Sequence, residues 1–476
     1  MHTPPPAEHA GALRHKLPRI RMPLVIAGVT TITGLILLCW PPLELPTAQG
    51  RAAGLAIIAI GLWATSQLPE HLTALLFFLL AMLVGVAPSS VIFSGFSSSA
   101  FWMVFAGLVI ALGAKSSGLS ERLAHSIALK LNGSYLSLIS GVMLVGVLLG
   151  FLMPSSMGRV VVLLVPVILA LAESFGFAAG SNGRIGVLLA ATFGSFVPTF
   201  AILPANVPNM ILVGTSETLF GIAPLYGEYL LLHFPVLGLL KSAVIIGLIV
   251  WRFPDRPKPY TGRTDNSSPL SRIEWKMAGI LLLALTFWLT DFVHHISPAW
   301  IALSAAMLLL LPRIGLISAQ QFSNDINYSP LFFIAGVLGM GALISHSGLG
   351  ARAATQLTTI LPLEPGNNLL NYTSLAFISL VTGIATTQPG VPAVLTPLAD
   401  QIALASGLPI KTVLMTQVLG FSTTLLLFQA PPLVIAMRLS GESTRPAIVL
   451  ALLLALVTIV LLLPLDYLWW RLLGWL

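Results

Sequence analysis

Two short polar clusters interrupt long apolar stretches of the sequence and contain its most chemically useful residues. The first cluster follows Pro154 and consists of Ser155, Ser156, Met157, Gly158 and Arg159; the second consists of Thr386, Thr387, Gln388, Pro389 and Gly390. Proline breaks helices, and the helix that begins after a break presents free N–H groups and a partial positive charge. With nearby hydroxyl and amide groups, such a helix end can bind a small carboxylate or sulfate. The two clusters are therefore candidate substrate-binding segments.

Arg159 is the most informative single residue, because it places a charge inside an apolar stretch. A charged side chain within a membrane segment costs free energy and marks a functional site by default. Two roles are open: counter-charge for an anionic substrate, or a fixed cation in the place of a bound metal ion. In a third interpretation Arg159 lies at the cytoplasmic tip of a hairpin and reaches water or lipid phosphate.

A second pair of helix breaks follows the two clusters along the chain. Prolines and amides stand at both breaks, with Asn206, Pro208 and Asn209 at the first and Gln429, Pro431 and Pro432 at the second. Amide side chains offer both donors and acceptors, so we expect them to face the polar clusters and to contact the substrate with them. The alternative is a structural kink, because membrane helices tolerate proline.

The composition places most of the chain in a lipid bilayer. Apolar residues make up 56% and charged residues 8% of the 476 residues, whereas soluble domains have about 45–50% and about 25%. This balance excludes soluble enzymes and nucleic-acid binders, and the single cysteine, Cys39, excludes a disulfide framework. In such a chain the net charge of +7 sets membrane orientation and does not indicate a nucleic-acid partner.

The apolar segments predict how the chain crosses the membrane, since a spanning helix needs about 20 apolar residues. Nine segments are candidate single spans: 24–40, 52–68, 72–87, 100–114, 230–250, 277–293, 299–312, 329–345 and 446–470. Three longer stretches are broken by Pro, Gly, Ser and Thr: 135–172, 185–215 and 370–437. The basic arm 1–22 predicts a cytoplasmic N-terminus. Most other basic residues then fall on the same side, provided that 135–172 and 370–405 are re-entrant hairpins.

An internal repeat joins the two halves of the chain. Residues 101–124 resemble 330–354, PSSMGRVVVLLVP (154–166) aligns with ATTQPGVPAVLTP (385–397), and 205–214 aligns with 430–437. The predicted topology inverts one copy relative to the other, which is the layout of secondary transporters. We therefore predict an all-α membrane protein with about 11 transmembrane helices, two re-entrant hairpins and two inverted repeats. The first half is 23–251, the cytoplasmic linker 252–276, and the second half 277–476, with its broken helix at 412–437.

Over roughly residues 50–470 the sequence resembles the divalent anion:sodium symporters, the dicarboxylate, citrate and sulfate carriers. The signature of that family is a Ser-Asn-Thr triplet in each hairpin, with a proline ten residues after the serine. Counting back from Pro166 and Pro397 gives Ser156-Met157-Gly158 and Thr387-Gln388-Pro389. The resemblance implies a homodimer in which a transport domain containing both hairpins moves as an elevator against a scaffold domain.

The departures from the signature bear on ion coupling. Met157 stands where the family has an asparagine that contacts substrate carboxylates, and unlike Gln388 it cannot donate a hydrogen bond to an anion. The resemblance implies that Na⁺ would bind near four residues, Ser156, Gly158, Thr387 and Pro389. A cation at Arg159 would repel Na⁺ and attract an anion, which favours reduced or absent Na⁺ dependence.

The sequence therefore predicts a secondary active transporter of a small, divalent organic or inorganic anion, in the dicarboxylate or sulfate class. We expect it in the inner (plasma) membrane as a multi-pass protein with no cofactor other than Na⁺ as a coupling ion. An uncoupled channel or an exchanger on the same fold is the alternative. A membrane-embedded enzyme is disfavoured, since the chain has no H-E-x-x-H or G-x-S-x-G motif.

Overall fold

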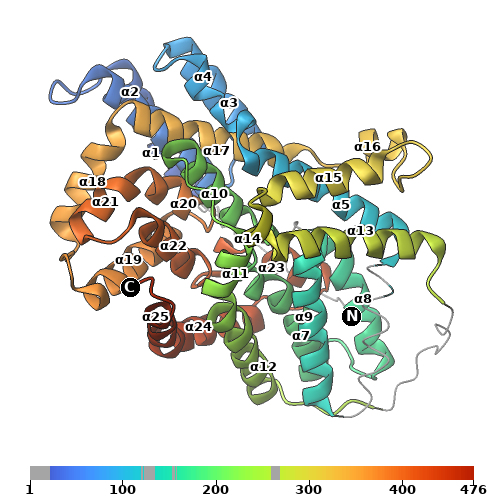
Figure 1. The fold of residues 1–476 in the computed structure, drawn as a ribbon. Helices are drawn as coiled ribbons and strands as arrows, with labels where there is room; N and C mark the ends of the chain where they lie inside the picture. Colours follow the sequence, from blue (N-terminus) through green and yellow to red (C-terminus); the bar gives the residue numbers. More distant parts are fainter. Residues whose placement is uncertain (1–21, 120–121, 123–133, 153–155, 157, 259–268) are drawn as a thin grey trace, which may run out of the picture.

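The computed structural model describes residues 22–476 except 120–121, 123–133, 153–155, 157 and 259–268. Every regular element within these described residues is a helix (Figure 1), which confirms the all-α class. The basic arm 1–21 and the centre of the predicted linker lie outside them. Helix α13 begins at Arg272, so the last residues of the predicted linker 252–276 are helical.

All nine predicted single spans form helices. They are α1 (Met22–Cys39), α2 (Thr47–Thr65), α3 (Glu70–Val84), α5 (Ser99–Ser117), the run α11–η5–α12 (Tyr226–Arg252), α13 (Arg272–Leu289), α15 (Pro298–Leu310), α17 (Ser329–His346) and the run α24–η8–α25 (Arg445–Leu472). Seven helices of the described chain are long and apolar enough to cross a membrane, whereas α3, α7 and α15 are apolar but shorter. The chain is thus a multi-pass membrane protein.

After α5 and α17 the two halves have a similar order of elements, except that α18 has no counterpart among the described residues of the first half. The first half continues with α7 (Tyr135–Leu152), η2 (Gly158–Leu164), α8 (Val165–Ser174), α9 (Asn182–Phe196) and α10 (Val207–Phe220). The second continues with α18 (Leu349–Ile360), α19 (Asn368–Ala385), α20 (Gly390–Leu395), α21 (Ala399–Ser406), α22 (Ile410–Phe421) and α23 (Pro431–Leu439). We call 135–174 and 368–406 the first and second hairpin segments. The run Gly390–Ser406 meets α22 at a bend of 120°.

The halves interlock by exchanging neighbours. Helix α3 of the first half packs against α17 of the second, and α15 of the second half packs against α5 of the first. In the same way α10 packs against α20 of the second hairpin segment, and α23 packs against η2 of the first. Each half therefore completes the packing of the other, as expected of a repeated unit that buries its apolar face only with its copy.

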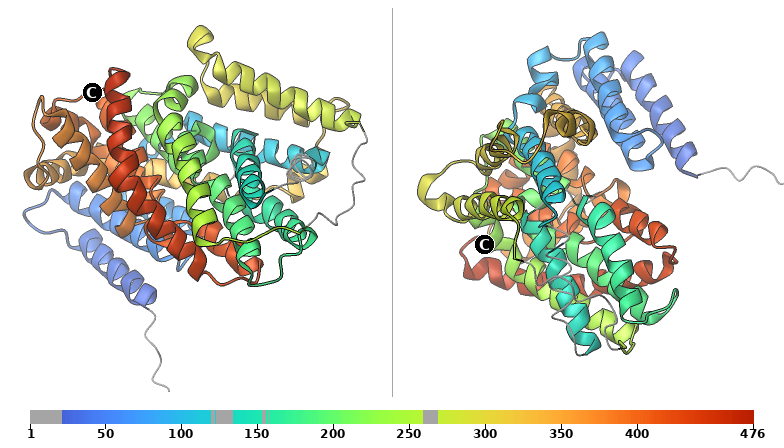
Figure 2. Two further views of the ribbon diagram at one scale, coloured as in Figure 1. Left: turned by 90° about the horizontal axis from the view of Figure 1, so that it is seen from below. Right: turned by 90° about the vertical axis from the view of Figure 1, so that its right-hand side faces the viewer.

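Each half ends in a long helix interrupted by a π-helical turn, η5 (Phe234–Leu240) and η8 (Thr458–Leu462). Pro235 and Pro464 lie in or beside these turns and remove a backbone donor from the helix. The two runs pack along one another, with η5 against η8 and α12 against α24 (Figure 2). They form the contact between the ends of the two halves.

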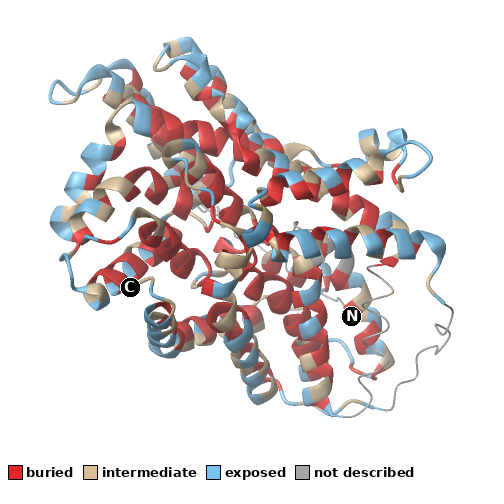
Figure 3. Ribbon diagram, in the orientation of Figure 1, coloured by how far each residue is buried: buried red, intermediate tan, exposed pale blue. Residues whose placement is uncertain are grey.

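Burial separates an inner set of helices from an outer set. Helices α9, α10, α17 and α22 are buried along most of their length, whereas α1, α12 and α24–α25 expose one side (Figure 3). The exposed sides carry large apolar residues, among them Leu24, Ile32, Leu239, Leu240, Leu456 and Leu461. An apolar exterior of this extent is the surface expected of a protein solvated by lipid.

Two acidic side chains accept hydrogen bonds from backbone N–H groups at the starts of helices. The carboxylate of Asp291, in α14 (Asp291–His294), accepts hydrogen bonds from the backbone N–H groups of Tyr226 and Gly227 at the start of α11. Glu274 caps its own helix α13 and binds Arg122 at 2.8 Å. The carboxylate of Asp291, which is close in sequence to His294 and His295, therefore accepts its hydrogen bonds from the backbone.

Candidate functional site

The first helix break lies between α9 and α10, at residues 197–206. Two short 3-10 turns, η3 (Pro198–Ala201) and η4 (Leu203–Ala205), replace the α-helix there, because Pro198 and Pro204 lack the N–H that would continue it. All residues of this break are buried. Its carbonyl groups therefore need donors from elsewhere in the protein.

Arg159 supplies such donors. It lies in η2, and its side chain is fully buried. Nη1 donates to the carbonyl of Ala205 at 3.0 Å, and Nη2 donates to the carbonyl of Ser195 at 3.1 Å and to Thr199 Oγ1 at 3.2 Å. Nε donates to Ser195 Oγ at 3.3 Å. The guanidinium is thus held among the oxygens of the first break and the end of α9, and it does not reach water at a hairpin tip.

Asn206 and Asn209 also bind the break. The side-chain amide nitrogen of Asn206 donates to the carbonyl of Ala205 at 3.0 Å, and its amide oxygen accepts from the N–H of Phe200 at 3.1 Å. Asn209 Nδ2 donates to the carbonyls of Phe200 and Ile202, at 3.1 and 2.8 Å. Asn209 Oδ1 is buried and has no hydrogen-bond partner within the described part of the chain. The structure therefore brings Asn206 to Arg159, and it places buried Pro208 at the start of α10.

The second break, residues 422–430, lies between α22 and α23 and is organised by neutral amides. Gln388, at the tip of the second hairpin segment, is 2% exposed and donates to Thr424 Oγ1 at 2.8 Å. Gln429 Oε1 accepts from the N–H groups of Leu425 and Leu426, at 2.9 and 2.8 Å. Beyond the break Pro431 is exposed, whereas Pro432 is buried. The second hairpin segment and its break are therefore in contact, as in the first half.

The two breaks meet inside the protein. The ring of Phe200 in the first break lies 5.8 Å from the ring of Phe421, the last residue of α22. Tyr229 of α11 donates to the carbonyl of Phe200 at 2.9 Å, which links the first break to the long helix of the same half. The first break thus lies against the end of α22, where the second break begins.

The remaining residues of the second cluster are half-buried. Thr386, Thr387, Pro389 and Gly390 line a small cleft with Trp63 of α2 and Phe333 of α17. The hydroxyl of Thr386 donates to the carbonyl of Thr382 at 2.6 Å and so caps α19. The cleft is lined mainly by apolar side chains, which suits helix packing better than the binding of an anion.

Several predicted residues of the first cluster are not placed. Pro154, Ser155 and Met157 lie outside the described residues, whereas Ser156 and Gly158 are half-buried. The signature position that Met157 occupies therefore stays a prediction.

The predicted sodium ligands Ser156, Gly158, Thr387 and Pro389 stay a prediction, but the carbonyl oxygens of the first break are also of the kind that can bind a cation. In carriers with discontinuous helices, unwound carbonyls and the C-terminal ends of half-helices coordinate the coupling cation. At the first break the carbonyls of Ser195 and Ala205 instead accept hydrogen bonds from Arg159. A positive side chain within hydrogen-bond distance of the same oxygens repels a second cation, so this break does not fit Na⁺.

Two buried ionisable residues were not predicted from the sequence as site residues. Lys241 of α12 and Asp466 of α25 are 1% and 0% exposed, and each stands in a long apolar run. A lone ionisable residue within a predicted span is the signal that could have marked them.

Comparisons with known proteins agree with this architecture. The family model described as a citrate transporter matches residues 60–420. A membrane protein of Cupriavidus necator is 23% identical over 93% of this chain and 91% of its own length. The L-tartrate/succinate antiporter of Escherichia coli (strain K12) is 25% identical, but the match spans only 54% of each chain.

A third relative and a solved structure extend the comparison. The putative malate transporter YflS of Bacillus subtilis is 23% identical over 61% of this chain and 63% of its own. The crystal structure of the Alcanivorax borkumensis YdaH transporter has a TM-score of 0.51, with 16% sequence identity over 84% of this chain and 89% of that chain. At this identity the structural match supports the fold alone.

Proposed function

The chain belongs to the citrate transporter family, as a divergent relative of the divalent anion:sodium symporters and not an enzyme, and from this we propose that it carries a small dicarboxylate across the plasma membrane. The relatives named for tartrate, succinate and malate favour this substrate class over sulfate. The proposed site lies where the two breaks meet. The described residues proposed to face the anion are Ser156, Gly158, Gln388, Asn206, Asn209 and Gln429.

The observation that carries the proposal is the buried guanidinium of Arg159. It is held by the carbonyls of the first break. We expect these bonds, and with them the buried positive charge, to persist during transport. A fixed cation of this kind makes the interior attractive to a dicarboxylate and removes the need for Na⁺ in the first half.

A fixed charge also favours exchange over net uptake. A carrier that must move a positive charge through lipid does so at lower cost when a bound anion neutralises it. We therefore infer that the protein exchanges one dicarboxylate for another. An elevator movement of the two hairpin segments against a scaffold, in a homodimer with a cytoplasmic N-terminus, is the mechanism that the family resemblance implies.

Uptake of radiolabelled succinate and sulfate into proteoliposomes tests this function. The wild type should take up succinate saturably, with acceleration by internal succinate and indifference to a Na⁺ gradient. Arg159→Ala should abolish uptake, whereas the control Arg352→Ala, at an exposed arginine of α18, should leave it unchanged. Na⁺-driven uptake that survives Arg159→Ala would refute the role of Arg159. Flux without saturation or counter-flow would point instead to an uncoupled channel.

A further inference from the structure

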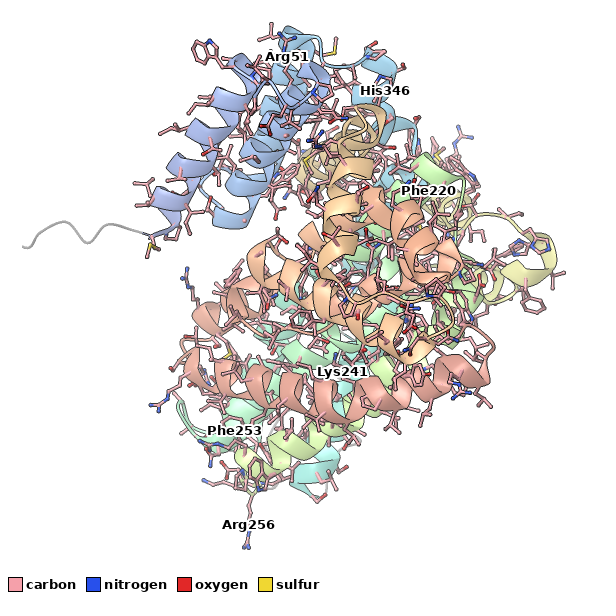
Figure 4. The ribbon with its side chains drawn as sticks, turned by 90° about the vertical axis from the view of Figure 1, so that its left-hand side faces the viewer. Arg51, Phe220, Lys241, Phe253, Arg256 and His346 are labelled. Atoms are coloured by element: carbon pink, nitrogen blue, oxygen red, sulfur yellow. The ribbon has the colours of Figure 1, made fainter. Side chains whose placement is uncertain are left out.

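The second break has its own buried basic residue, supplied by the other half of the chain. Lys241 begins α12, directly after the π-helical turn η5, and it lies beside the run α24–η8–α25 (Figure 4). Its ammonium Nζ donates to the carbonyl of Ser422 at 2.8 Å. Ser422 directly follows α22, whose last residue is Phe421, so Lys241 binds the point at which the second break starts.

This contact matches the contact of Arg159 in the first half. Arg159 binds the carbonyl of Ser195, in the last turn of α9, and Lys241 binds the carbonyl that ends α22, the counterpart of α9. The C-terminal end of a helix carries a partial negative charge, and it is stabilised by a cation. Each of the two broken helices is therefore capped by one fully buried basic side chain.

Asp466 completes the surroundings of Lys241. It lies on α25, which with η8 and α24 packs along the run that contains Lys241, and it is fully buried. Asp466 Oδ2 accepts from the hydroxyl of Tyr372 on α19 at 2.9 Å, which ties α25 to the second hairpin segment. The ammonium is thus bound to a helix-end carbonyl, and a buried carboxylate lies in its surroundings without a direct ion pair to it. A small metal cation would use the same two kinds of oxygen.

We propose that Lys241 is the fixed cation of the second break, as Arg159 is of the first, and that the two side chains take the place of coupling metal cations. This inference rests on the proposed function and deepens it, because it predicts a carrier with no sodium site in either half. It also explains why a charge stands at the centre of a lipid-exposed helix run, where it would otherwise be costly.

The prediction that separates this role from simple packing is a gain of cation dependence. Lys241→Met removes the donor from the Ser422 carbonyl and leaves the buried Asp466 without a buried basic residue on the neighbouring helix run. Na⁺ or methylammonium should then bind there and restore the stability and the exchange activity that depend on the ammonium. Lys241→Arg keeps a cation and should stay independent of Na⁺.

Lys411 provides a matched control, because it lies on α22, the helix whose end Lys241 binds. It lies at the other end of α22, is partly exposed, and pairs with Glu228 at 2.6 Å. Lys411→Met removes the same functional group, an ammonium, without touching a break. It should create no Na⁺ dependence.

Two readouts on the full-length purified protein test the proposal. The first is thermal unfolding in detergent, in sodium, methylammonium or choline chloride. The midpoint should rise with Na⁺ or methylammonium for Lys241→Met alone. The second is succinate exchange in proteoliposomes, which Lys241→Met should lower by about tenfold or more in choline, because a buried acceptor loses its donor, and which Na⁺ should restore.

Each outcome decides the question. Equal Na⁺ stabilisation of the wild type and Lys241→Met, or a loss in Lys241→Met that no cation restores, would overturn the proposal. If Lys241→Met yields no folded protein, Lys241→Gln undergoes the same series. A wild type that exchanges no dicarboxylate but shows the expected unfolding pattern would refute the transport function and leave the fixed-cation role standing.

Discussion

Replacing Gly146 by alanine should disturb the Arg159 site without touching it. Gly146 lies on α7, where that helix crosses α9 at close range. A Cβ atom at this position would lie 2.7 Å from the backbone nitrogen of Ser195 and 2.8 Å from the carbonyl carbon of Gly194. Ser195 is the residue whose carbonyl and hydroxyl both accept hydrogen bonds from Arg159.

The size of the effect follows from these distances. Carbon atoms in contact are optimally about 3.5 Å apart, so α7 and α9 must separate by about 0.7–0.8 Å. The obstructing atoms belong to the backbone and cannot rotate away, so the strain should cost about 1–3 kcal/mol. The same displacement would take the contact between Arg159 and the Ser195 carbonyl, now 3.1 Å, beyond the range of a hydrogen bond.

Thermal unfolding in detergent and succinate uptake measure the two consequences. Gly146→Ala should unfold at a lower temperature than the wild type and should lose transport. The control is Gly247→Ala on α12, where a Cβ meets nothing within 4 Å. That change should be neutral or stabilise by about 0.4–1 kcal/mol, since alanine restricts the unfolded chain. If Gly146→Ala unfolds at or above the wild-type temperature, the close packing of α7 on α9 is refuted.

Two further predictions concern acidic residues outside the site. Asp291→Ala should destabilise the protein by about 1–3 kcal/mol in thermal unfolding, because two backbone N–H groups at the start of α11 lose their acceptor. Asp291→Asn should lose less stability. An unchanged unfolding midpoint in Asp291→Ala would contradict the role of Asp291 as a cap. The Ser271 backbone N–H, with Arg122, lowers the pKa of Glu274 below its ordinary 4.5, so its stabilisation is complete above the unfolded-state pKa and disappears as pH falls through the folded-state pKa. Unfolding midpoints measured from neutral to acid pH should show this loss, and Glu274→Gln should lack it.

Much of the fold could be predicted because it depends on local composition. A run of apolar residues long enough to cross a bilayer has few alternatives to a helix, since every backbone group must be paired within lipid. For this reason all nine predicted single spans form helices. The breaks were predictable for a related reason: the prolines of 198–208 lack the donors that a continuous helix needs.

The length and shape of the long helices were less accessible from the sequence. The segment 446–470 was predicted as one span, and it forms one run, but with a π-helical turn at Thr458–Leu462. Such a turn depends on how the run packs against η5 of the other half, and the hydrophobic pattern of either segment alone does not contain that information.

The sequence by itself determined that the chain lies in lipid, that it repeats, that its helices break at two pairs of sites, and that Arg159 is out of place among apolar neighbours. Only the tertiary structure decided which groups the buried basic side chains contact. Arg159 meets a carbonyl 46 residues away, and Lys241 meets one 181 residues away. The first contact joins two segments of one half, and the second joins the two halves through their interlocked helices. Once buried, each unpaired carbonyl and each charge must find a partner of opposite sign within the protein, because lipid offers none.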